Sequence, residues 1–485
     1  MIRISRKNRV FAAVFTTILT VLSVLWSGSF TPVQQAAASP AAPKPEGSSR
    51  QPYKIGAIQA KEQLAYVLGV QAYLYGYPLV EMEKIKAESL QNLAPLNQFA
   101  YITRLATPAD RVIVSPNADT LYLFAWLDLA NGPVTLHVPE DPDGRYYTIE
   151  MLDAYTNVFQ NVSSRSTKQK AGNYAIVGPS WKGKLPSRTK RIVAPTNMVW
   201  LIGRVEVKDQ ADLPKAVAFQ KQFALSSPGN HENKAQPGPL TSAKSNKTQQ
   251  VLDPLAFFAV MTDAIKRNPP PPCDEVLLDQ FKLIGIDPST GFQPQALDPP
   301  IIAGLTRAAR DARSIIEHSD KLFTQSENGW TSTPLLGRYG DQFLLRAYVA
   351  YSGIGANVPS EEKYARTFVD STGVPLNGKN KYVLHFAKDQ IPDVSAFWSV
   401  TMYGPDFYLV PNSIQRYSIG SLTKGLVYNP DGSLDLYIQS TPPPKGESNW
   451  LPAPSGPFNL VLRMFEPRPK SLSEPYRIPP VRKLP

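Results

Sequence analysis

The chain has 485 residues, of which 42% are apolar and 19% are charged, and it contains 47 prolines. These values exclude a wholly disordered protein, and the length exceeds what one hydrophobic core usually supports, so we expect two domains. The formal net charge of +11 comes from scattered Lys and Arg residues, with Arg188–Arg191 as the one tight cluster of the body. Such scatter is typical of a solvated surface and argues against nucleic acid as a partner.

The N-terminus has the three-part pattern of an export signal. Residues 1–9 hold four basic side chains, Val10–Trp26 is almost wholly apolar, and Ala36–Ala38 offers a small-residue cleavage site. We predict a signal peptide over residues 1–38, a flexible leader over 39–55, and export to the periplasm or the extracellular space. The alternative is an uncleaved anchor, because about 17 apolar residues are the lower limit for crossing a bilayer. Without residues 1–38 the charge is 47 − 40 = +7, and no later segment is apolar enough to span a membrane.

An N-terminal β-sandwich domain with leading helices is predicted over residues 56–225. Apolar residues recur at helical spacing from Ala57 to about Glu88, with a break expected near Gly76 and Pro78. From residue 112 to 207 short apolar runs alternate with Gly, Pro, Asn and Asp turn signals, the punctuation of a sandwich or barrel.

A loop and helical insert is predicted over residues 226–355, and a second β-sandwich domain with an extended tail over 356–485. Residues 225–250 are polar, and Asp253-Pro254 then supplies a helix start. A later helix carries a stripe with steps of three and four: Ile302, Leu305, Ala309, Ala312 and Ile316. The predicted fold class is α+β, mainly β, with two jelly-roll-like β-sandwiches and a helical insert between them.

Several kinds of site are not indicated by the sequence. Cys273 is the single cysteine, so the chain cannot form an internal disulfide. The four histidines are far apart and no H-E-x-x-H pair occurs, so no metal site is predicted. No P-loop, G-x-G-x-x-G or G-x-S-x-G pattern occurs, so no cofactor is predicted either.

The segment Ser115–Tyr122 is the first candidate for a site because it brings polar groups into strand-like sequence. Asn117, Asp119 and Tyr122 present amide, carboxyl and hydroxyl groups, and Pro116 should hold Ser115 in an extended conformation. Such a set suits a sugar, a carboxylate or a cation. The alternative is that Asn117 and Asp119 only cap their own turn.

Asp153, Tyr155 and Asn157 repeat this composition after a predicted strand. Asp119 and Asp153 are therefore predicted as catalytic carboxylates, a pair that a glycosidase would need at roughly 5 to 9.5 Å. The same oxygens could hold calcium, and the spacing in the sequence does not decide between the two.

Arginines and aromatic residues complete the predicted substrate-binding set. Arg165 and Arg416 offer guanidinium forks for an anion. Trp398, Tyr403 and Trp450 offer rings for stacking, although a buried core position is the commoner place for tryptophan. Phe397–Tyr403, which holds two of these rings, is the second stretch that mixes polar and aromatic residues in a strand.

Motifs in both halves resemble a known pair of families. Ser115–Tyr122, Arg145–Tyr147, Asp153–Asn157, Gly178–Trp181 and Trp200–Arg204 resemble the domain of unknown function 1254. Phe397–Tyr403, Asn412–Tyr417, Asn429–Gly432 and Asn449–Pro454 resemble its C-terminal partner, the domain of unknown function 1214.

This resemblance implies a bacterial, often exported protein with two jelly-roll-like sandwiches and with helices between and beside them. The family's activity is unassigned, so the resemblance transfers no catalytic residue. Where the family has a Gly-x-Arg-Thr-Thr-Gly run, this chain has Val162–Lys168, and the loss of both glycines puts a close backbone approach to a ligand in doubt.

The resulting hypothesis is an envelope enzyme of hydrolase type that acts on a small polar or carbohydrate-like substrate in a cleft between the sandwiches. A non-catalytic binding protein and a structural or interaction protein of the cell envelope are the alternatives. Assembly into a homo-oligomer is left open.

Overall fold

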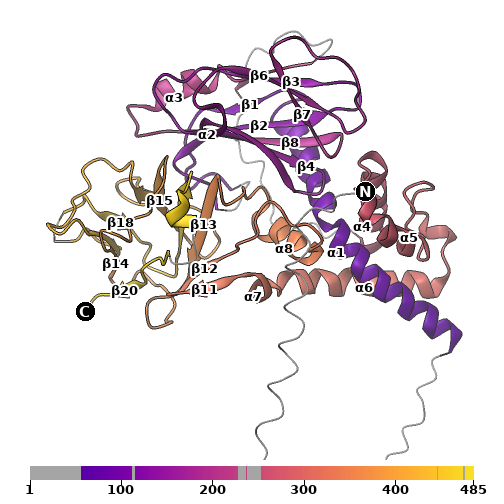
Figure 1. The fold of residues 1–485 in the computed structure, drawn as a ribbon. Helices are drawn as coiled ribbons and strands as arrows, with labels where there is room; N and C mark the ends of the chain where they lie inside the picture. The colour runs from indigo at the N-terminus through magenta and orange to yellow at the C-terminus, as the bar shows by residue number, and fades with distance from the viewer. Residues whose placement is uncertain (1–55, 112–114, 228–235, 238–252, 445, 473–475) are drawn as a thin grey trace, which may run out of the picture. The chain divides into compact units, whose positions relative to one another are not determined.

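A computed structural model describes residues 56–111, 115–227, 236–237, 253–444, 446–472 and 476–485 (Figure 1). The predicted signal peptide and leader lie outside the described residues, as does most of the polar segment 225–250. Blocks of strands are separated by a block of helices, which confirms the α+β class. In the described part of the chain no helix combines the length and the apolar character that crossing a bilayer requires.

The N-terminal sandwich consists of a six-stranded sheet in the order β10-β1-β2-β8-β4-β5 and a four-stranded sheet in the order β7-β6-β3-β9. The six strands are β1 (Ala100–Ile102), β2 (Thr120–Asp128), β4 (Tyr147–Asp153), β5 (Val158–Ser163), β8 (Met198–Glu206) and β10 (Gln236–Pro237). The four strands are β3 (Val134–Val138), β6 (Gly172–Val177), β7 (Thr189–Val193) and β9 (Ala224–Ser226). Leu121, Leu123 and Leu127 alternate toward the core between the two sheets, whereas Tyr122 and Phe124 point to the opposite face.

Helices cover that opposite face of the six-stranded sheet (Figure 1). The long helices are α1 (Ala57–Asn92), α4 (Pro254–Arg267), α6 (Pro299–Glu317) and α8 (Phe343–Gly353). The shorter ones are α2 (Ser164–Thr167), α3 (Leu213–Gln220), α5 (Glu275–Lys282), α7 (Asp320–Phe323) and α9 (Pro469–Leu472). The predicted N-cap Asp253 accepts hydrogen bonds from the backbone of Leu255 and Ala256, and the predicted stripe of α6 is largely buried.

The break that we predicted near Gly76 and Pro78 is wrong, because α1 continues through both residues. A proline inside a helix costs about 3 kcal/mol, so burial of the surrounding turns has to outweigh that cost. Pro78 is itself buried, and Arg346 of α8 donates a hydrogen bond to the carbonyl of Tyr75, one turn before the proline. Packing against neighbouring helices therefore overrides the local sequence signal.

Glycines let α1 and α6 lie close together. A Cβ on Gly304 would lie 2.4 Å from the carbonyl oxygen of Glu62, and one on Gly69 would lie 2.8 Å from the Cβ of Ala308. Neither distance is tolerated between real atoms, so both positions require glycine at this helix contact.

The C-terminal sandwich has a six-stranded sheet in the order β11-β12-β13-β19-β15-β16 and a four-stranded sheet in the order β18-β17-β14-β20. The first consists of β11 (Gln325–Glu327), β12 (Trp330–Ser332), β13 (Glu362–Thr367), β15 (Trp398–Tyr403), β16 (Ser418–Gly420) and β19 (Asn459–Phe465). The second consists of β14 (Tyr382–Phe386), β17 (Leu434–Gln439), β18 (Trp450–Pro452) and β20 (Val481–Lys483). Strands β11 and β12 come from the predicted helical insert and extend this sheet. The jelly-roll connection pattern stays a prediction.

Alternation along β15 and β19 separates the core from an outer face. Trp398 and Val400 point into the core between the two C-terminal sheets. Ser399 and Thr401 point outward, and Ser399 lies opposite Arg463 in the sheet register. This outer face meets residues 115–119 of the N-terminal half through the hydrogen bonds described next.

Candidate functional site

The two segments that the sequence singled out, Ser115–Tyr122 and Phe397–Tyr403, are in direct contact. Ser399 Oγ donates to Asp119 Oδ2 at 2.6 Å, and Tyr403 Oη donates to the carbonyl oxygen of Pro116 at 2.7 Å. Ser418 Oγ donates to the other carboxyl oxygen of Asp119. The Asp119 carboxylate is thus held across the junction between the two sandwiches.

Turn capping accounts for Asn117 but not for Asp119. Asn117 Oδ1 accepts the backbone N–H of Asp119 at 2.6 Å, which is the local turn bond expected for asparagine. The backbone N–H of Asn117 in turn donates to Tyr122 Oη at 3.2 Å. Asn117, Asp119, Tyr122 and Tyr403 are therefore the predicted site residues that the structure brings together.

The expectation that Ser115 is extended is wrong. Its φ is +53°, in the left-handed region that residues with a side chain rarely adopt. The surroundings hold it there: its N–H donates to Phe407, its carbonyl oxygen accepts from Arg463 at 2.8 Å, and its Oγ accepts from Arg366 at 2.8 Å. Phe407 is also left-handed, with φ of +63°. Backbone strain of this kind is frequent at functional sites.

Charged residues from both halves surround this contact and form what we call the charge cluster: Glu150, Arg204, Glu362, Arg366 and Arg463. Arg204 Nη1 donates to Glu150 Oε2 at 2.7 Å, and its Nε lies 3.6 Å from Glu362 Oε2. Arg463 Nε lies 3.7 Å from the other oxygen of Glu362. The exposed fractions are 0% for Glu150, 6% for Arg204, 1% for Glu362 and 4% for Arg463. Four charges are thus buried between the sandwiches.

Glu150 has the protonation behaviour of an acid–base group. Burial raises its pKa to about 7, although the Arg204 guanidinium opposes this rise. Burial acts in the other direction on Arg204, but the carboxylates of Glu150 and Glu362 raise its pKa well above the usual range. At neutral pH Arg204 is therefore charged, whereas Glu150 populates both its protonated and its ionised form.

Arg366 differs from the other arginines of the cluster. It is half-buried, and no carboxylate of the described residues lies within ion-pair distance of its guanidinium. The group lies over the ring of Phe407 at 5.0 Å, and burial and the nearby charge of Arg463 lower its pKa. With Asp119 included, three arginines face three carboxyl groups, so protonation of Glu150 leaves an excess of positive charge.

Several buried polar atoms here have no hydrogen-bond partner among the described residues. They are Asn117 Nδ2, Thr120 Oγ1, Tyr146 Oη, Glu150 Oε1 and Glu362 Oε2. A buried polar atom without a partner costs about 1 to 3 kcal/mol, so native proteins rarely keep several together. They are therefore candidate groups for hydrogen bonds to a small polar molecule.

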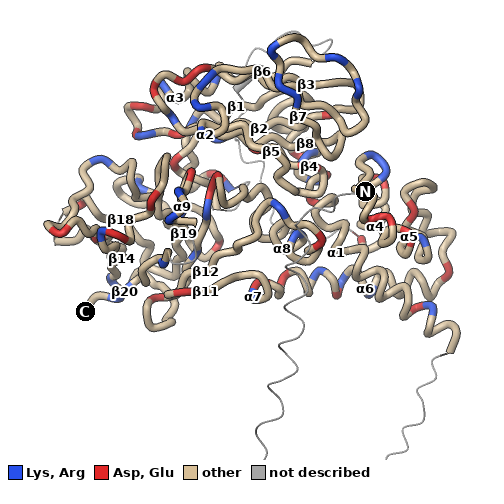
Figure 2. The backbone as a smooth tube through the Cα atoms, in the orientation of Figure 1, with Lys and Arg blue, Asp and Glu red and all other residues tan. Residues whose placement is uncertain are grey.

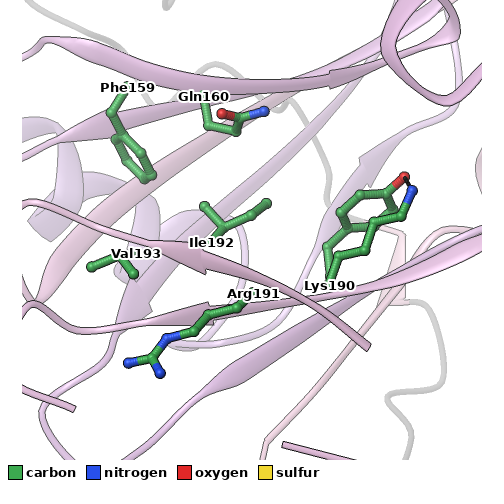
Figure 3. Close-up of a pocket in the computed structure, with 7 residues that line it drawn as sticks. Phe159, Gln160, Lys190, Arg191, Ile192 and Val193 are labelled. Atoms are coloured by element: carbon green, nitrogen blue, oxygen red, sulfur yellow. Dashed lines mark hydrogen bonds between the residues drawn. The ribbon is translucent and has the colours of Figure 1, made fainter. Parts of the chain in front are cut away.

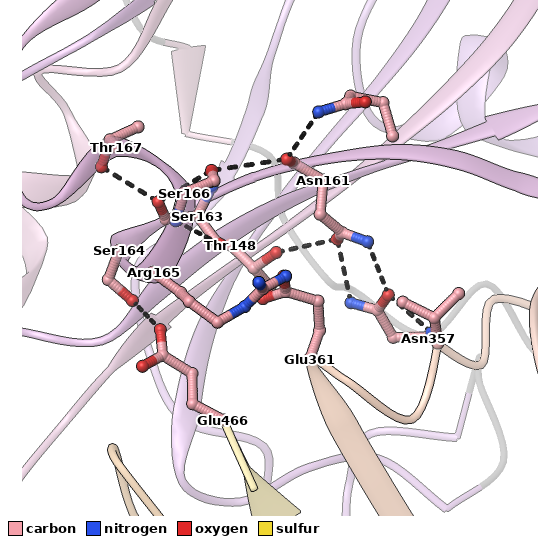
Figure 4. A network of polar contacts seen from close by, with 12 residues as sticks. Thr148, Asn161, Ser163, Ser164, Arg165, Ser166, Thr167, Asn357, Glu361 and Glu466 are labelled. Atoms are coloured by element: carbon pink, nitrogen blue, oxygen red, sulfur yellow. Dashed lines mark hydrogen bonds and ion pairs between the residues drawn. The ribbon is translucent and has the colours of Figure 1, made fainter. Parts of the chain in front are cut away.

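A second set of contacts next to the cluster fastens the two halves together (Figure 4). Arg165 forms an ion pair with Glu361, and Ser164 donates to Glu466. The side chains of Asn161 and Asn357 exchange hydrogen bonds of 3.0 and 3.1 Å. Arg165, a predicted anion-binding residue, is thus paired with a carboxylate of the other half.

Residues 162–168, which depart from the family pattern, end in a strained conformation. They form the short helix α2, capped by reciprocal bonds between Ser163 and Ser166. Lys168 follows with φ of +53°, a conformation that glycine adopts without strain. At the position where the sequence resemblance implies a glycine, Lys168 therefore holds a left-handed backbone.

Asp119 and Asp153 do not form a carboxylate pair. Thr120, next to Asp119, lies opposite Glu206 of β8, whereas Asp153 lies opposite Val199 of the same strand. The two partners are 206 − 199 = 7 residues apart, or about 23 Å along a strand. This overturns both the glycosidase-type pair and a calcium ion shared by the two carboxylates.

Asp153 organises a turn with its neighbours. Its Oδ1 accepts the backbone N–H groups of Tyr155 and Asn157, both at 2.9 Å, and Asn157 Nδ2 donates to Oδ2 at 3.0 Å. Burial raises the pKa of Asp153, and the bonds from Asn157 oppose that rise. Tyr155 Oη donates to the carbonyl oxygen of Asn268. This group lies apart from Asp119, so its catalytic and binding roles remain predictions.

The remaining candidates belong to the C-terminal sandwich. Trp398 and Trp450 are 2% and 1% exposed, which leaves no ring surface for stacking on a ligand. Trp450 Nε1 donates to the carbonyl of Gln439, and Arg416 donates to the carbonyl of Trp450 at 2.9 Å. The structure therefore does not bring Trp398, Trp450 or Arg416 to the charge cluster.

The sequence interpretation missed the five residues of the charge cluster. The signal was present, because Glu150, Arg204 and Arg463 each interrupt an apolar strand. All three strands are buried along their whole length. A charge at such a position needs a partner. Among the described residues no group of three His, Cys, Asp or Glu side chains is arranged to hold a metal ion.

Comparison with known proteins gives a match to one family in each half of the chain. Residues 96–227 match the family described as Protein of unknown function (DUF1254), and residues 361–469 match Protein of unknown function (DUF1214). No curated protein matches the chain.

Two solved structures are similar. The VPA0106 protein from Vibrio parahaemolyticus is 24% identical over 87% of this chain and 100% of its own, with a TM-score of 0.67. An uncharacterized protein from Burkholderia cenocepacia is 11% identical over 88% of this chain and 93% of its own, with a TM-score of 0.40. The first likeness extends to the fold alone. The chain thus carries a match to DUF1254 in its N-terminal half and a match to DUF1214 C-terminal to it, as the sequence resemblance predicted.

Proposed function

We propose that this protein is an enzyme of hydrolase type that binds a small anionic, polar or carbohydrate-like molecule at the charge cluster. The observation that supports this most is Glu150, a fully buried carboxyl group with a pKa of about 7, whose Oε1 accepts no hydrogen bond from the described residues. A general acid or base works best when its pKa is close to the pH of its surroundings.

The residues around Glu150 have different roles in this proposal. Arg366, which has a hydroxyl but no carboxylate partner, binds the negative group of the ligand together with Arg463. The bound anion favours the protonated form of Glu150. Glu150 donates its proton to the leaving oxygen as a water molecule attacks and the bond to that oxygen breaks, and the proton that the water releases passes to Asp119. Asp119 orients the hydroxyls of Ser399 and Ser418 and remains the predicted second catalytic carboxylate.

Replacement of Arg366 tests the binding step. We expect acetate, citrate, phosphate or glucuronate to raise the melting temperature of the wild-type protein, and glucose to have little effect. In Arg366→Met the shift should disappear, because ligand stabilisation depends on affinity for the folded state. Arg468→Met is the matched control, since Arg468 is 56% exposed and paired with Asp393 on the surface. Equal shifts in Arg366→Met and wild type would place the anion elsewhere.

Turnover separates an enzyme from a binding protein that uses the same site. Nitrophenyl esters, phosphate esters and glycosides are suitable first substrates. With a hydrolysed substrate in hand, Glu150→Gln should lower kcat by about 10²- to 10⁴-fold, the usual contribution of general acid–base catalysis. Binding of an anion without turnover by the wild-type protein would favour the alternative, a non-catalytic ligand-binding protein of the cell envelope.

We also propose that the protein is exported, on the strength of the basic, apolar and small-residue pattern of residues 1–38. The mass of the protein isolated from its native host should then correspond to a chain that begins close to residue 39. A full-length mass with residues 1–38 retained would instead favour the uncleaved anchor. The mass of the native assembly in the same preparation would show whether the protein forms a homo-oligomer.

A further inference from the structure

One part of the chain is strongly basic. From residue 154 to 205 it contains nine Lys and Arg residues and no Asp or Glu. Five of the nine lie between residues 181 and 191: Lys182, Lys184, Arg188, Lys190 and Arg191. Figure 2 shows Lys and Arg positions gathered around β6 and β7. Among the described residues none of these five forms an ion pair with a carboxylate, so their charge is not neutralised by the protein itself.

These charges belong to a strand with a free edge. Within the part of the chain that the structure describes, β7 is the last strand of its sheet and pairs only with β6, in parallel. The N–H of Ala194 donates to the carbonyl of Val177, which continues the β6–β7 ladder. Because the bonding direction alternates along a parallel strand, the N–H and C=O groups of Arg191 and Val193 point away from β6. The free edge can therefore accept another strand.

A pocket of about 360 Å³ lies beside this edge (Figure 3). Phe159 and Gln160 of β5 line it together with Ile192 and Val193 of β7. β5 is likewise the last strand of its own sheet, so the pocket lies between two sheet edges. The side chain of Val193 is 52% exposed, which adds an apolar contact to a basic rim.

The basic side chains are already arranged on aromatic rings. Lys190 Nζ lies 5.0 Å from the ring centre of Tyr174, and the Arg191 guanidinium lies 5.1 Å from that of Trp181. One face of each ring is therefore occupied by a cation. This argues against single-stranded nucleic acid, which stacks its bases on free rings. The pocket beside this open strand edge also fits an extended peptide chain better than it fits a flat lipid surface.

We propose that β7 is the docking site for an extended acidic peptide segment of a partner protein, which adds to the sheet as a further strand. Main-chain bonds to Arg191 and Val193 supply affinity, as in other complexes formed by strand addition. The five cations select acidic side chains, and the pocket takes an apolar side chain of the peptide. The same charges prevent two copies of this edge from pairing with each other.

The probe is a fluorescently labelled peptide of alternating glutamate and valine, measured by polarisation with the purified protein. We expect binding that weakens with salt and falls at least about tenfold in Lys190→Glu/Arg191→Glu, because rim charges act through electrostatic attraction. A version of this peptide with N-methyl groups on alternate backbone amides should not bind. It keeps the charge, but it lacks the backbone N–H donors that pairing with β7 requires. Arg310→Glu, at an exposed arginine of α6, serves as the control.

Val193→Pro tests the backbone contact within the protein. Proline removes an N–H that points away from β6 and leaves the hydrogen bonds between β6 and β7 intact. The variant should therefore fold but no longer bind the peptide. Equal binding of the N-methylated peptide would overturn strand addition. Tighter binding to phosphatidylglycerol vesicles or to single-stranded DNA, in competition with the peptide, would overturn the choice of partner.

Discussion

Arg204→Met should lower the free energy of unfolding by about 3 to 5 kcal/mol, the usual result of removing one partner from a buried ion pair. Arg204 contacts Glu150 at 2.7 Å and Glu362 at 3.6 Å, and both carboxyl groups are almost fully buried. Without the guanidinium, Glu362 keeps Arg463 as an ion-pair partner at 3.7 Å, whereas Glu150 has no ion-pair partner left among the described residues. Urea denaturation at neutral pH measures the difference.

Arg310→Met is the matched control, because Arg310 is 75% exposed and paired only with Asp311. Such surface pairs contribute about 0 to 1 kcal/mol. The double variant Glu150→Gln/Arg204→Met should be less destabilised than Arg204→Met alone, since one uncompensated charge has been removed. A loss no larger than that of Arg310→Met would mean that the cluster does not hold the sandwiches together.

Period-two alternation made the fold largely predictable. Strands such as Leu121-Tyr-Leu-Phe and Trp398-Ser-Val-Thr alternate between a core face and an outer face, and turn residues separate them. The same alternation distinguishes Trp398, which points into the core, from Ser399 and Tyr403, which reach the other half of the chain. The prediction of a helix break at Pro78 was wrong because a local sequence pattern does not contain the packing energy that distant helices contribute.

The candidate site was predictable only in part. Asn117 and Asp119 stood out because polar residues in a strand-like segment require an explanation. Glu362 could not be connected to Arg204 from the sequence, since 158 positions separate them and the pair forms only when the two sandwiches meet. Ser115 shows the same limit: the residue before a proline is normally extended, and contacts with the distant residues Arg366, Phe407 and Arg463 hold it otherwise.

Contacts beside the charge cluster explain why a polar site at this junction is stable. The neighbouring bonds from Arg165 to Glu361 and between Asn161 and Asn357 are satisfied on both sides. They fix the two halves without using the charge cluster. The cluster can then keep Glu150 Oε1 and Glu362 Oε2 without a hydrogen bond from the described residues, although Glu362 Oε2 lies 3.6 Å from Arg204 Nε, at a cost that the surrounding packing offsets.

The pH dependence of stability should reveal the protonation of Glu150. Its pKa is about 7 in the folded protein, against the usual 4.5 for glutamate. Because the folded state binds this proton more tightly, Glu150 contributes stability that is fully present below pH 4.5 and is lost as the pH rises through 7. The loss is roughly 3 kcal/mol for a shift of this size.

Comparison with Glu150→Gln isolates this effect from all other titrating groups. The free energy of unfolding of Glu150→Gln minus that of the wild type should rise by roughly 3 kcal/mol between about pH 4.5 and 7, then level off. A falling difference would mean that the ion pair with Arg204 outweighs burial, so that the folded protein holds Glu150 as a permanent carboxylate. Carbon-13 labelling of glutamate carboxyls gives a direct second measurement, since the resonance that is missing in Glu150→Gln should titrate near pH 7. A permanent carboxylate at this position could not donate the proton that the proposed hydrolysis requires.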